Sequence, residues 1–279
     1  MIDFSQFEDK EYYTNKRLKI CGNFIYYYQY GKSFKIGKRI FRPKNEIFDD
    51  NVKQYSEQEI RDRVLRRARR KISDLVNSNS YSWADESGFV FKPIFLTLTF
   101  EENVTDIEMA NYEFTKFIQR FNYEITGQKG SYLKYVAVIE FQERGAIHYH
   151  AIIFNLPFIE KIYDKLKTIW TAGFFKISLI DKVKNVGFYL VKYMHKKLED
   201  PRLKGHKCYF TSKNLKQPRV IYFEELINLI LPMLPQETKE KEIENIRIDY
   251  LLTMDIIIYN LKEQPDIKQA VLDFINQYL

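Results

Sequence analysis

The hydrophobic positions between residues 90 and 200 follow two periods, one typical of strands and one typical of helices. Short runs of apolar, β-branched and aromatic residues predict four strands, at residues 94–100, 133–141, 147–154 and 174–180. Apolar residues that recur every three or four positions predict three helices, at residues 107–124, 158–170 and 184–198. Gly173 is expected to end the second of these helices.

The order of these elements predicts an α+β fold. The loop between strands 133–141 and 147–154 is so short that the two should form an antiparallel hairpin, with Gly145 in its turn. A sheet and its helices form a stable domain when they pack as layers around one core. We therefore expect a central antiparallel sheet with helices packed on one face, while the other face stays exposed.

The segments that flank this core have patterns of their own. Residues 23–40 are expected to form a hairpin that turns at Gly31-Lys32. Ser56 and Glu59 form a capping box, and a stripe of apolar residues at helical spacing then predicts an amphipathic helix, along Ile60, Val64, Ala68, Ile72 and Leu75. After Pro218, helices are expected at residues 222–231, 237–262 and 266–278. These patterns divide the chain into residues 1–90 (hairpin and basic helix), residues 91–218 (core) and residues 219–279 (acidic helical C-terminal region).

The charge of the chain is distributed unevenly. The net charge is +7, but residues 221–279 carry 11 acidic and 5 basic side chains, whereas residues 1–220 carry 39 basic and 26 acidic. A basic body of this kind favours binding to nucleic acid, because its cations replace the counterions of phosphates. The residues expected to contact DNA lie on the amphipathic helix, at Arg63, Arg66, Arg67, Arg70 and Lys71. The alternative for this basic face is a solvated surface without a partner.

Several functional classes are disfavoured by what the sequence lacks. Cys21 and Cys208 are isolated and have neither disulfide-scaffold nor metal-ligand spacing, which is typical of a reducing cytoplasm. There is no signal-peptide pattern and no apolar run long enough for a membrane span, so no membrane partner is expected. A P-loop is also absent, so unwinding of a duplex would need a separate helicase from the host. The oligomeric state cannot be deduced from the sequence.

Two of the four histidines of the chain stand in one three-residue motif, His148-Tyr149-His150. In a strand, residues two apart point to the same face, so both imidazoles can bind one ion. Glu140 ends the preceding strand and is the expected third ligand, with Glu143 of the turn as the alternative carboxylate. A site with a carboxylate favours Mg²⁺ or Mn²⁺. Without a metal, the two histidines would be hydrogen-bonded polar groups of an apolar strand.

About forty residues later, Tyr189 and Tyr193 are four positions apart with Lys192 between them. On a helix this spacing places both phenols on one face and the lysine beside them. A phenol is a nucleophile in covalent catalysis when a metal or base activates it. Because the chain has 21 tyrosines, packing is the alternative for either one taken alone.

Taken together, these motifs resemble those of the HUH endonucleases, and more narrowly of the rolling-circle replication initiators of single-stranded DNA phages, plasmids and related integrated elements. Besides the histidine and tyrosine motifs, the family has an upstream Thr-rich apolar strand, which Thr97 and Thr99 match. The resemblance covers roughly residues 90 to 200 and keeps the family's order of motifs. Tyr149 departs from it, because an aliphatic residue is commoner between the two histidines.

The resemblance implies a metal-dependent enzyme that nicks and rejoins single-stranded origin DNA. Tyr189 would attack the phosphate, keep the 5′ end as a phosphotyrosine ester and release a 3′-hydroxyl. Lys192 would stabilise the charge of the phosphate or of the phenolate, and Tyr193 would perform a second transfer. A host helicase and polymerase are the further partners implied.

Three alternatives remain at this point. A conjugative relaxase of the same superfamily usually has a third histidine and a tyrosine near the N-terminus, and neither is seen here. A small transposase of the superfamily is shorter and typically uses one tyrosine. A non-catalytic nucleic-acid-binding module would need only the basic helix and an aromatic sheet face, and it would leave the grouping of Glu140 with the paired histidines and tyrosines unexplained.

Overall fold

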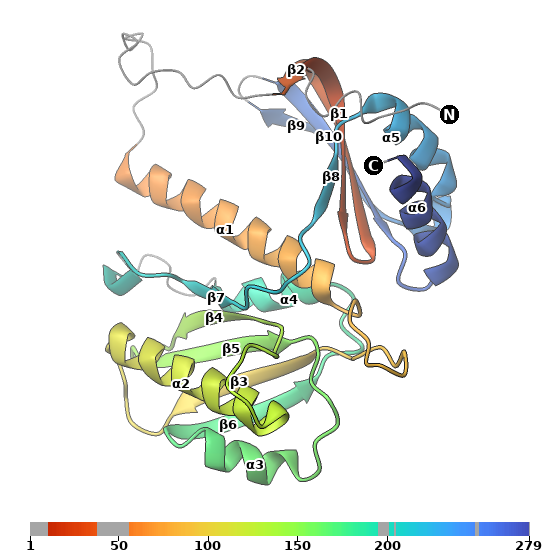
Figure 1. Ribbon diagram of the computed structural model, residues 1–279. Coiled ribbons are helices and arrows are strands. Elements are labelled where there is room, and N and C mark those ends of the chain that lie inside the picture. Colours follow the sequence, from red (N-terminus) through yellow and green to blue (C-terminus); the bar gives the residue numbers. More distant parts are fainter. Residues whose placement is uncertain (1–10, 38–55, 195–200, 204, 249–250, 279) are drawn as a thin grey trace. The chain divides into compact units, whose positions relative to one another are not determined.

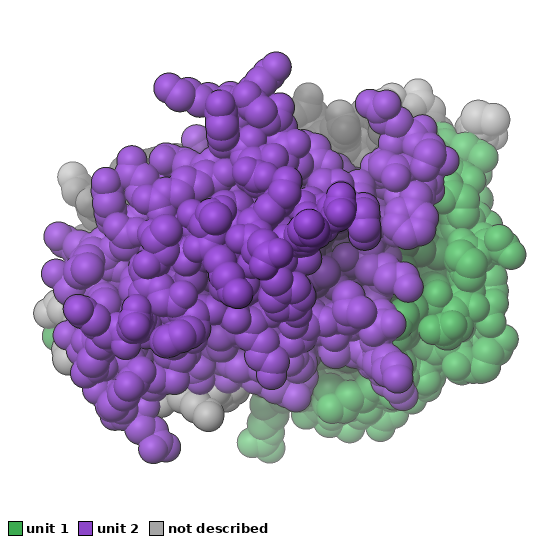
Figure 2. Space-filling model, turned by 90° about the horizontal axis from the view of Figure 1, so that it is seen from below, with its two compact units in different colours: residues 1–57, 218–279 green, residues 58–217 purple. Residues whose placement is uncertain are grey.

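The computed structural model describes residues 11–37, 56–194, 201–203, 205–248 and 251–278 (Figure 1). The chain divides into two compact units, which Figure 2 shows in different colours. One unit consists of residues 58–217, and the other combines residues 1–57 with residues 218–279. Each unit has a five-stranded antiparallel sheet of its own, so the α+β class and the antiparallel sheet expected from the sequence are confirmed.

The sheet of residues 58–217 has the strand order β6-β3-β5-β4-β7. Its strands lie close to the segments predicted for them, at β3 (Ile94–Phe100), β4 (Tyr135–Phe141), β5 (Ile147–Ile153) and β6 (Gly173–Leu179), with the short β7 (Tyr209–Thr211) added at the edge. Strand β5 is buried along its whole length because it lies in the centre, between β3 and β4. The predicted hairpin of β4 and β5 is confirmed.

Helices α2 (Ile107–Thr126) and α3 (Ile162–Ile169) cover one face of this sheet (Figure 1). The side chains between them and the sheet are largely aromatic, with Phe114, Phe117 and Trp170 buried against Tyr149 of β5. The ring of Phe114 stacks on that of Tyr149 at a centroid distance of 4.5 Å. Burying each large apolar side chain stabilises the fold by about 1.5–3 kcal/mol. This layer is therefore a main source of the unit's stability.

The other face of the sheet is covered as well, by α1 (Glu57–Asn79) and α4 (Val186–Val191). Val136 and Val138 of β4 point to this face, because neighbours along a strand alternate between faces. They pack with Ile72 of α1 and Leu190 of α4. The expectation that this second face would be exposed is therefore wrong. Enough apolar residues alternate onto it to require a second layer of helices.

Two predicted helices are shorter than expected. Helix α3 ends at Ile169, and Gly173 is the first residue of β6 rather than the end of the helix. A Cβ on Gly173 would lie 2.3 Å from the backbone nitrogen of Glu101, so a close approach of two strands requires the glycine. The helix predicted at 184–198 is α4 as far as Val191, followed by a 3₁₀ turn (Lys192–Met194). Residues 195–198 lie outside the described residues.

The amphipathic helix α1 is confirmed, but its buried side is not the predicted stripe. Ile60 is 50% exposed and Val64 is 59% exposed, whereas burial begins at Ile72 and continues through Leu75 and Val76. The stripe was placed on a single row of residues four apart. In the structure only the second half of the helix is buried against β3, β4 and β5, so the first half has no apolar partner there.

The sheet of the other unit has the strand order β8-β1-β2-β10-β9. Its strands are β1 (Tyr12–Cys21), β2 (Phe24–Ile36), β8 (Arg219–Ile221), β9 (Lys239–Ile248) and β10 (Leu252–Asn260). Helices α5 (Glu224–Ile230) and α6 (Pro265–Tyr278) pack on one face of this sheet. The core between them contains Leu18, Ile25, Leu226 and Val271.

Two predictions for this unit are wrong. The N-terminal hairpin turns at Gly22-Asn23, and Gly31 lies inside β2, where a Cβ would approach Thr253 Oγ1 of β10 to 2.6 Å. The glycine thus permits close pairing of two strands and does not mark a turn. The helix predicted at 237–262 is the hairpin of β9 and β10, because pairing of β10 with β2 extends the sheet.

The units also group the segments differently from the expected division at residues 90 and 218. The N-terminal hairpin pairs with β8 and β10 near the C-terminus, whereas α1 packs on the sheet of residues 58–217. Segments far apart in sequence therefore form one unit. None of the helices in the described part of the chain has both the length and the hydrophobicity that a membrane span requires.

Candidate metal and nucleophile site

The hairpin of β4 and β5 brings the three expected metal ligands together. Glu140 pairs directly with His148 in the register of the two strands, and His150 lies two residues further along β5 on the same face. The turn between the strands is closed by hydrogen bonds between Gln142 and Ala146, and Gly145 has a φ of 87° there. Because L-residues with side chains rarely adopt this backbone conformation, the glycine sets the register of the hairpin.

The ligand atoms of Glu140, His148 and His150 all lie within 4.8 Å of one another. His150 Nε2 is 2.6 Å from Glu140 Oε2. Both imidazoles are almost fully buried, with 7% of His148 and 4% of His150 exposed. Glu143, the alternative carboxylate, lies exposed in the turn and is not part of this group. The structure therefore places Glu140, not Glu143, beside the histidine pair.

Side chains around the histidines fix the orientation of the rings. Thr97 Oγ1 of β3 lies 3.2 Å from His150 Nδ1, and Gln142 Nε2 lies 3.3 Å from His148 Nδ1. Contacts to the outer ring nitrogen are what hold metal-binding histidines in place. The Thr-rich strand that the sequence singled out thus contacts the site through Thr97.

The residues present fit a divalent cation. His148 Nε2 is buried and has no hydrogen-bond partner among the described residues, which is costly for a polar atom unless a ligand completes it. Burial, followed by the nearby His150, lowers the pKa of His148 from its usual value. The imidazole is thereby kept neutral, which is the form that binds metals. Two imidazoles and one carboxylate leave further coordination positions open.

The two tyrosines lie on the same face of the sheet as the histidines. The ring of Tyr193 stacks on that of His150, with a centroid distance of 4.0 Å and an interplanar angle of 29°. Phe95 of β3 contacts both tyrosine rings, at 5.1 Å from Tyr189 and 5.2 Å from Tyr193. Both tyrosines are half-buried. Contact with the imidazoles sets these two apart from tyrosines that only fill a core.

A hydrogen bond joins the two phenols directly. Tyr193 donates its hydroxyl to the hydroxyl oxygen of Tyr189 over 3.3 Å. Burial raises the pKa of Tyr193, and the bond to Tyr189 and the charge of Glu140 raise it further. Tyr193 is therefore the phenol that keeps its proton. The ammonium of Lys192 is 5.9 Å from the centroid of the Tyr189 ring, on an exposed side chain next to the pair.

Residues 93–198 match the model of a family of replication-associated proteins, the ORF2 family. The match covers β3 and the Glu140 group and extends past Tyr193, so it contains every residue of the candidate site named so far. It supports a replication initiator family and a role in replication. The comparisons found no match among curated proteins or solved structures.

Helix α1, outside the region that matches the ORF2 family, anchors the segment that carries the tyrosines. Asn77, 3% exposed, accepts a hydrogen bond from Gly187 N (2.8 Å) and donates one to Asn185 Oδ1 (3.1 Å). Asn185 caps the start of α4 by accepting from Phe188 N. A Cβ on Gly187 would lie 2.3 Å from Ser73 O, so α4 approaches α1 as closely as a backbone can. The start of the tyrosine helix is thus fixed by α1.

The end of the tyrosine segment is held by Arg69, which donates from Nη2 to Met194 O over 3.3 Å. Arg69, Ser73 and Asn77 are spaced four residues apart and therefore lie along one side of α1. The sequence analysis missed this role. A buried asparagine within a helix was a usable indication, because such a side chain needs partners. Nothing in the sequence separated Arg69 from the other arginines of α1.

The residues expected to bind DNA lie on the same helix. Arg66, Arg67, Arg70 and Lys71 are exposed, and Arg63 is half-buried. They belong to the turns of α1 on either side of Arg69, whose guanidinium reaches the tyrosine segment. The helix that carries these cations is therefore also the helix that positions the tyrosines.

A second arginine, Arg202, supports the turn of the metal hairpin. It donates two hydrogen bonds from Nη1, to Gly145 O (2.8 Å) and to Thr105 O (3.1 Å), and its guanidinium lies 4.2 Å from the centroid of the Phe141 ring. Such contacts hold the β4–β5 turn against the segment that precedes α2. The sequence analysis did not identify this residue, because it is distant from the hairpin in sequence.

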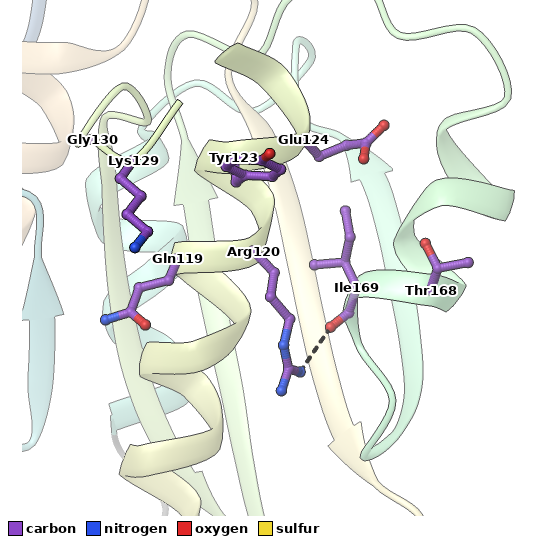
Figure 3. Close-up of a pocket in the computed structure, with 8 residues that line it drawn as sticks. All are labelled: Gln119, Arg120, Tyr123, Glu124, Lys129, Gly130, Thr168 and Ile169. Atoms are coloured by element: carbon purple, nitrogen blue, oxygen red, sulfur yellow. Dashed lines mark hydrogen bonds between the residues drawn. The ribbon is translucent and has the colours of Figure 1, made fainter. Parts of the chain in front are cut away.

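A cavity of about 740 Å³ lies away from this site, between the end of α2 and the end of α3. Figure 3 shows Arg120 extending from α2 to Ile169, whose carbonyl accepts a hydrogen bond from it over 3.3 Å. Its lining also contains Tyr123, Glu124 and Lys129. These helices cover the sheet face opposite the histidines, so the cavity does not belong to the candidate site.

Proposed function

We propose that this protein initiates rolling-circle replication by nicking and rejoining single-stranded DNA at an origin, through a 5′-phosphotyrosine intermediate and with a divalent metal ion. The observation that carries the proposal is the contact between two groups of residues. Glu140, His148 and His150 form a potential metal site, and the ring of Tyr193, itself bonded to Tyr189, stacks directly on His150.

Glu140, His148 and His150 would hold the ion, and Mg²⁺ or Mn²⁺ suits a site of this composition. When bound, a divalent ion supplies Lewis-acid polarisation of the scissile phosphate. The protein contributes the arrangement around it. Thr97 and Gln142 orient the imidazoles, and burial keeps His148 neutral and able to coordinate.

Tyr189 is the proposed nucleophile for the first transfer. Its hydroxyl loses the proton and the oxygen attacks phosphorus, so that a Tyr189–phosphate bond forms as the bond from phosphorus to the 3′-oxygen breaks. The 3′-oxygen takes up a proton and leaves as a free hydroxyl. Because Tyr193 donates a hydrogen bond to the Tyr189 oxygen, it stabilises the negative charge that forms there during deprotonation.

The same residues support resealing. Attack by a 3′-hydroxyl on the phosphotyrosine restores the phosphodiester and the free phenol, and one ester is exchanged for another in both directions. Tyr193 is proposed to carry out the second transfer, for which it would have to lose the proton that it holds in this arrangement. Exposed Lys192, next to both phenols, would stabilise the charge on the phosphate.

Origin DNA would be held in part by the exposed cations of α1, through its phosphates. The contacts from α1 to both ends of the tyrosine segment join this proposed binding helix to the chemistry. A host helicase and a host polymerase are proposed as partners, because the chain has no P-loop for unwinding of its own.

The test uses the full chain and random-sequence single-stranded oligonucleotides labelled at the 3′ end, with Mn²⁺ or EDTA. Because the 5′ phosphate stays on the enzyme, a 3′ label should enter an SDS-resistant adduct and a 5′ label should appear on a shorter free strand. Tyr189→Phe is expected to lower adduct formation by about two orders of magnitude or more. Tyr193→Phe should mainly impair transfer to a second strand.

The proposal fails if the double variant Tyr189→Phe/Tyr193→Phe forms as much adduct as the wild type. It also fails if the label that enters the adduct is the one at the 5′ end, because the covalent bond would then be to the other side of the nick. Adduct formation in EDTA at the rate seen with Mn²⁺ would remove the metal from the mechanism.

A further inference from the structure

Two lysines converge on one indole ring outside the candidate site. The ammonium groups of Lys134 and Lys216 lie 4.4 Å and 4.7 Å from the centroid of the Trp83 ring. Lys134 directly precedes β4, Lys216 follows β7, and Trp83 lies in the loop after α1. All three belong to the unit of residues 58–217. The fold thus brings two like charges together from distant parts of the chain.

The indole is held rigidly. Trp83 donates from Nε1 to Asn79 Oδ1 over 3.0 Å, and Asn79 is fully buried. The same oxygen accepts from Lys216 N at 2.9 Å, and Asn79 Nδ2 donates to Lys216 O at 2.9 Å. One buried side chain therefore positions both the ring and the backbone of a lysine that lies over it. A surface ring that only covers apolar atoms would not need such a support.

The two positive charges are not neutralised within the protein. Neither lysine forms an ion pair with a carboxylate of the described residues. Burial lowers the pKa of both ammonium groups, and the charge of Lys216 lowers that of Lys134 further. An anion bound between the two would remove the repulsion and complete a site that already has an aromatic floor.

We propose that Trp83, Lys134 and Lys216 form a binding site for a phosphodiester group of the single-stranded DNA, separate from the position of the nick. The proposal rests on the function proposed above, because it takes the substrate from it. Lys134 and Glu140 are six residues apart along one extended segment and therefore point to the same face, about 20 Å from one another. The site would hold the strand at a distance from the scissile phosphate.

An exposed aromatic ring next to the site suits a nucleotide rather than a free anion. The loop after α1 folds back on itself, with Ala84 bridged to Val90 and with Phe91 N donating to Trp83 O over 2.8 Å. Phe89, on the return side of this loop, is 63% exposed. Stacking of bases on such rings is the usual complement to backbone contacts in single-strand binding.

The fluorescence of Trp83 reports directly on this site. The chain has two tryptophans, and Trp170 is only 2% exposed, so a bound strand should change the emission of Trp83. We expect a change in emission when a random-sequence single-stranded oligonucleotide is added to the full chain in EDTA, where no cleavage takes place. The change should be absent in Trp83→Phe. A change that persists in Trp83→Phe would come from Trp170 and would contradict the assignment.

Lysine substitutions test the role of charge. The double variant Lys134→Met/Lys216→Met should bind the oligonucleotide about tenfold more weakly in low salt, and the slope of log K against log[salt] should become shallower by about 1.4 because two phosphate contacts are lost. Lys134→Arg/Lys216→Arg should retain the wild-type slope. The matched control is Lys167→Met on α3, an exposed lysine below the opposite sheet face, which should leave both quantities unchanged.

The outcomes separate this inference from the function on which it rests. If the wild type forms the adduct but neither the Trp83 emission nor the Lys134/Lys216 slope responds to DNA, the site is refuted and the proposed function stands. If both respond but no adduct forms, the site stands as a DNA contact and the proposed function fails. A response to millimolar inorganic phosphate that oligonucleotides do not produce would assign the site to a small anion and overturn the proposal.

Discussion

The candidate site depends on a few side chains that the β4–β5 hairpin presents on one face. Within it, His148 Nε2 is the atom with the clearest chemical demand, because it is buried without a hydrogen-bond partner among the described residues. The sequence predicted the grouping of Glu140, His148 and His150 from strand periodicity alone, and their ligand atoms lie within 4.8 Å of one another. The stacking of Tyr193 on His150 was beyond sequence reasoning, because a spacing along the chain does not show which strand a helix faces.

At this scale we predict that Mn²⁺ stabilises the wild type against thermal unfolding and that His148→Ala abolishes the effect. A ligand at a hundred times its Kd stabilises the native state by about 2.7 kcal/mol, which raises the melting temperature by several degrees. Differential scanning fluorimetry with and without Mn²⁺ measures the difference. His206→Ala, at an exposed histidine outside the group, is the control and should keep the full shift. An equal shift in His148→Ala would place the ion elsewhere.

The elements differ in how far the sequence determines them. Strands β3 to β6 and helix α2 were predicted nearly to the residue, because their periodicity is strong and their caps are local, as with Asp106 and Gly127 at the two ends of α2. The hairpin of β9 and β10 was mistaken for a helix. Its strand conformation depends on pairing of β10 with β2, more than two hundred residues earlier in the chain. Pairing over such a distance is not visible in local propensity.

The attachment of α4 to α1 gives a prediction for the element that carries the nucleophiles. Asn77→Ala removes the partner of the Gly187 N–H, which should cost about 1–3 kcal/mol of stability and lower the melting temperature. If Asn77 positions the tyrosines, adduct formation measured well below the new melting temperature should also fall, while the stabilisation by Mn²⁺ is retained. Asn214→Ala, an exposed asparagine that bonds Ser131 O, is the control. Unchanged adduct formation would limit Asn77 to a structural role.

Gly187→Ala examines the same attachment from the other helix. The added methyl group would lie 2.3 Å from Ser73 O, so α4 must move away from α1. We expect a larger loss of adduct formation than for Asn77→Ala, because the displacement affects the whole helix on which Tyr189 lies. Adduct kinetics of the two variants at one temperature give the comparison. Equal, wild-type rates in both would show that the close approach is not needed for catalysis.

The whole molecule consists of two units with separate cores. The two clusters of buried residues around the β6-β3-β5-β4-β7 sheet draw only on residues 58–217, and the other two draw only on the remaining unit. All residues of the candidate site belong to the first unit. The sequence separated an acidic C-terminal part from a basic body, but it did not show that the N-terminal hairpin joins the C-terminal part.

We therefore predict that residues 56–217, expressed alone, fold cooperatively and keep the stabilisation by Mn²⁺. A core of this size is sufficient for an independent domain. A single unfolding transition that shifts with Mn²⁺, followed by circular dichroism, would agree with this division. A fragment that stays unfolded at all metal concentrations would show that the unit needs the rest of the chain.

The most direct test of the central claim is to identify the residue that becomes covalently attached to DNA. The wild type is incubated with single-stranded DNA and Mn²⁺, the bound strand is trimmed with nuclease, and the peptides are analysed by mass spectrometry. The account predicts a nucleotide linked through its 5′ phosphate to Tyr189, and none on this peptide in EDTA. A nucleotide found only on a tyrosine outside the segment of Tyr189 and Tyr193 would contradict it.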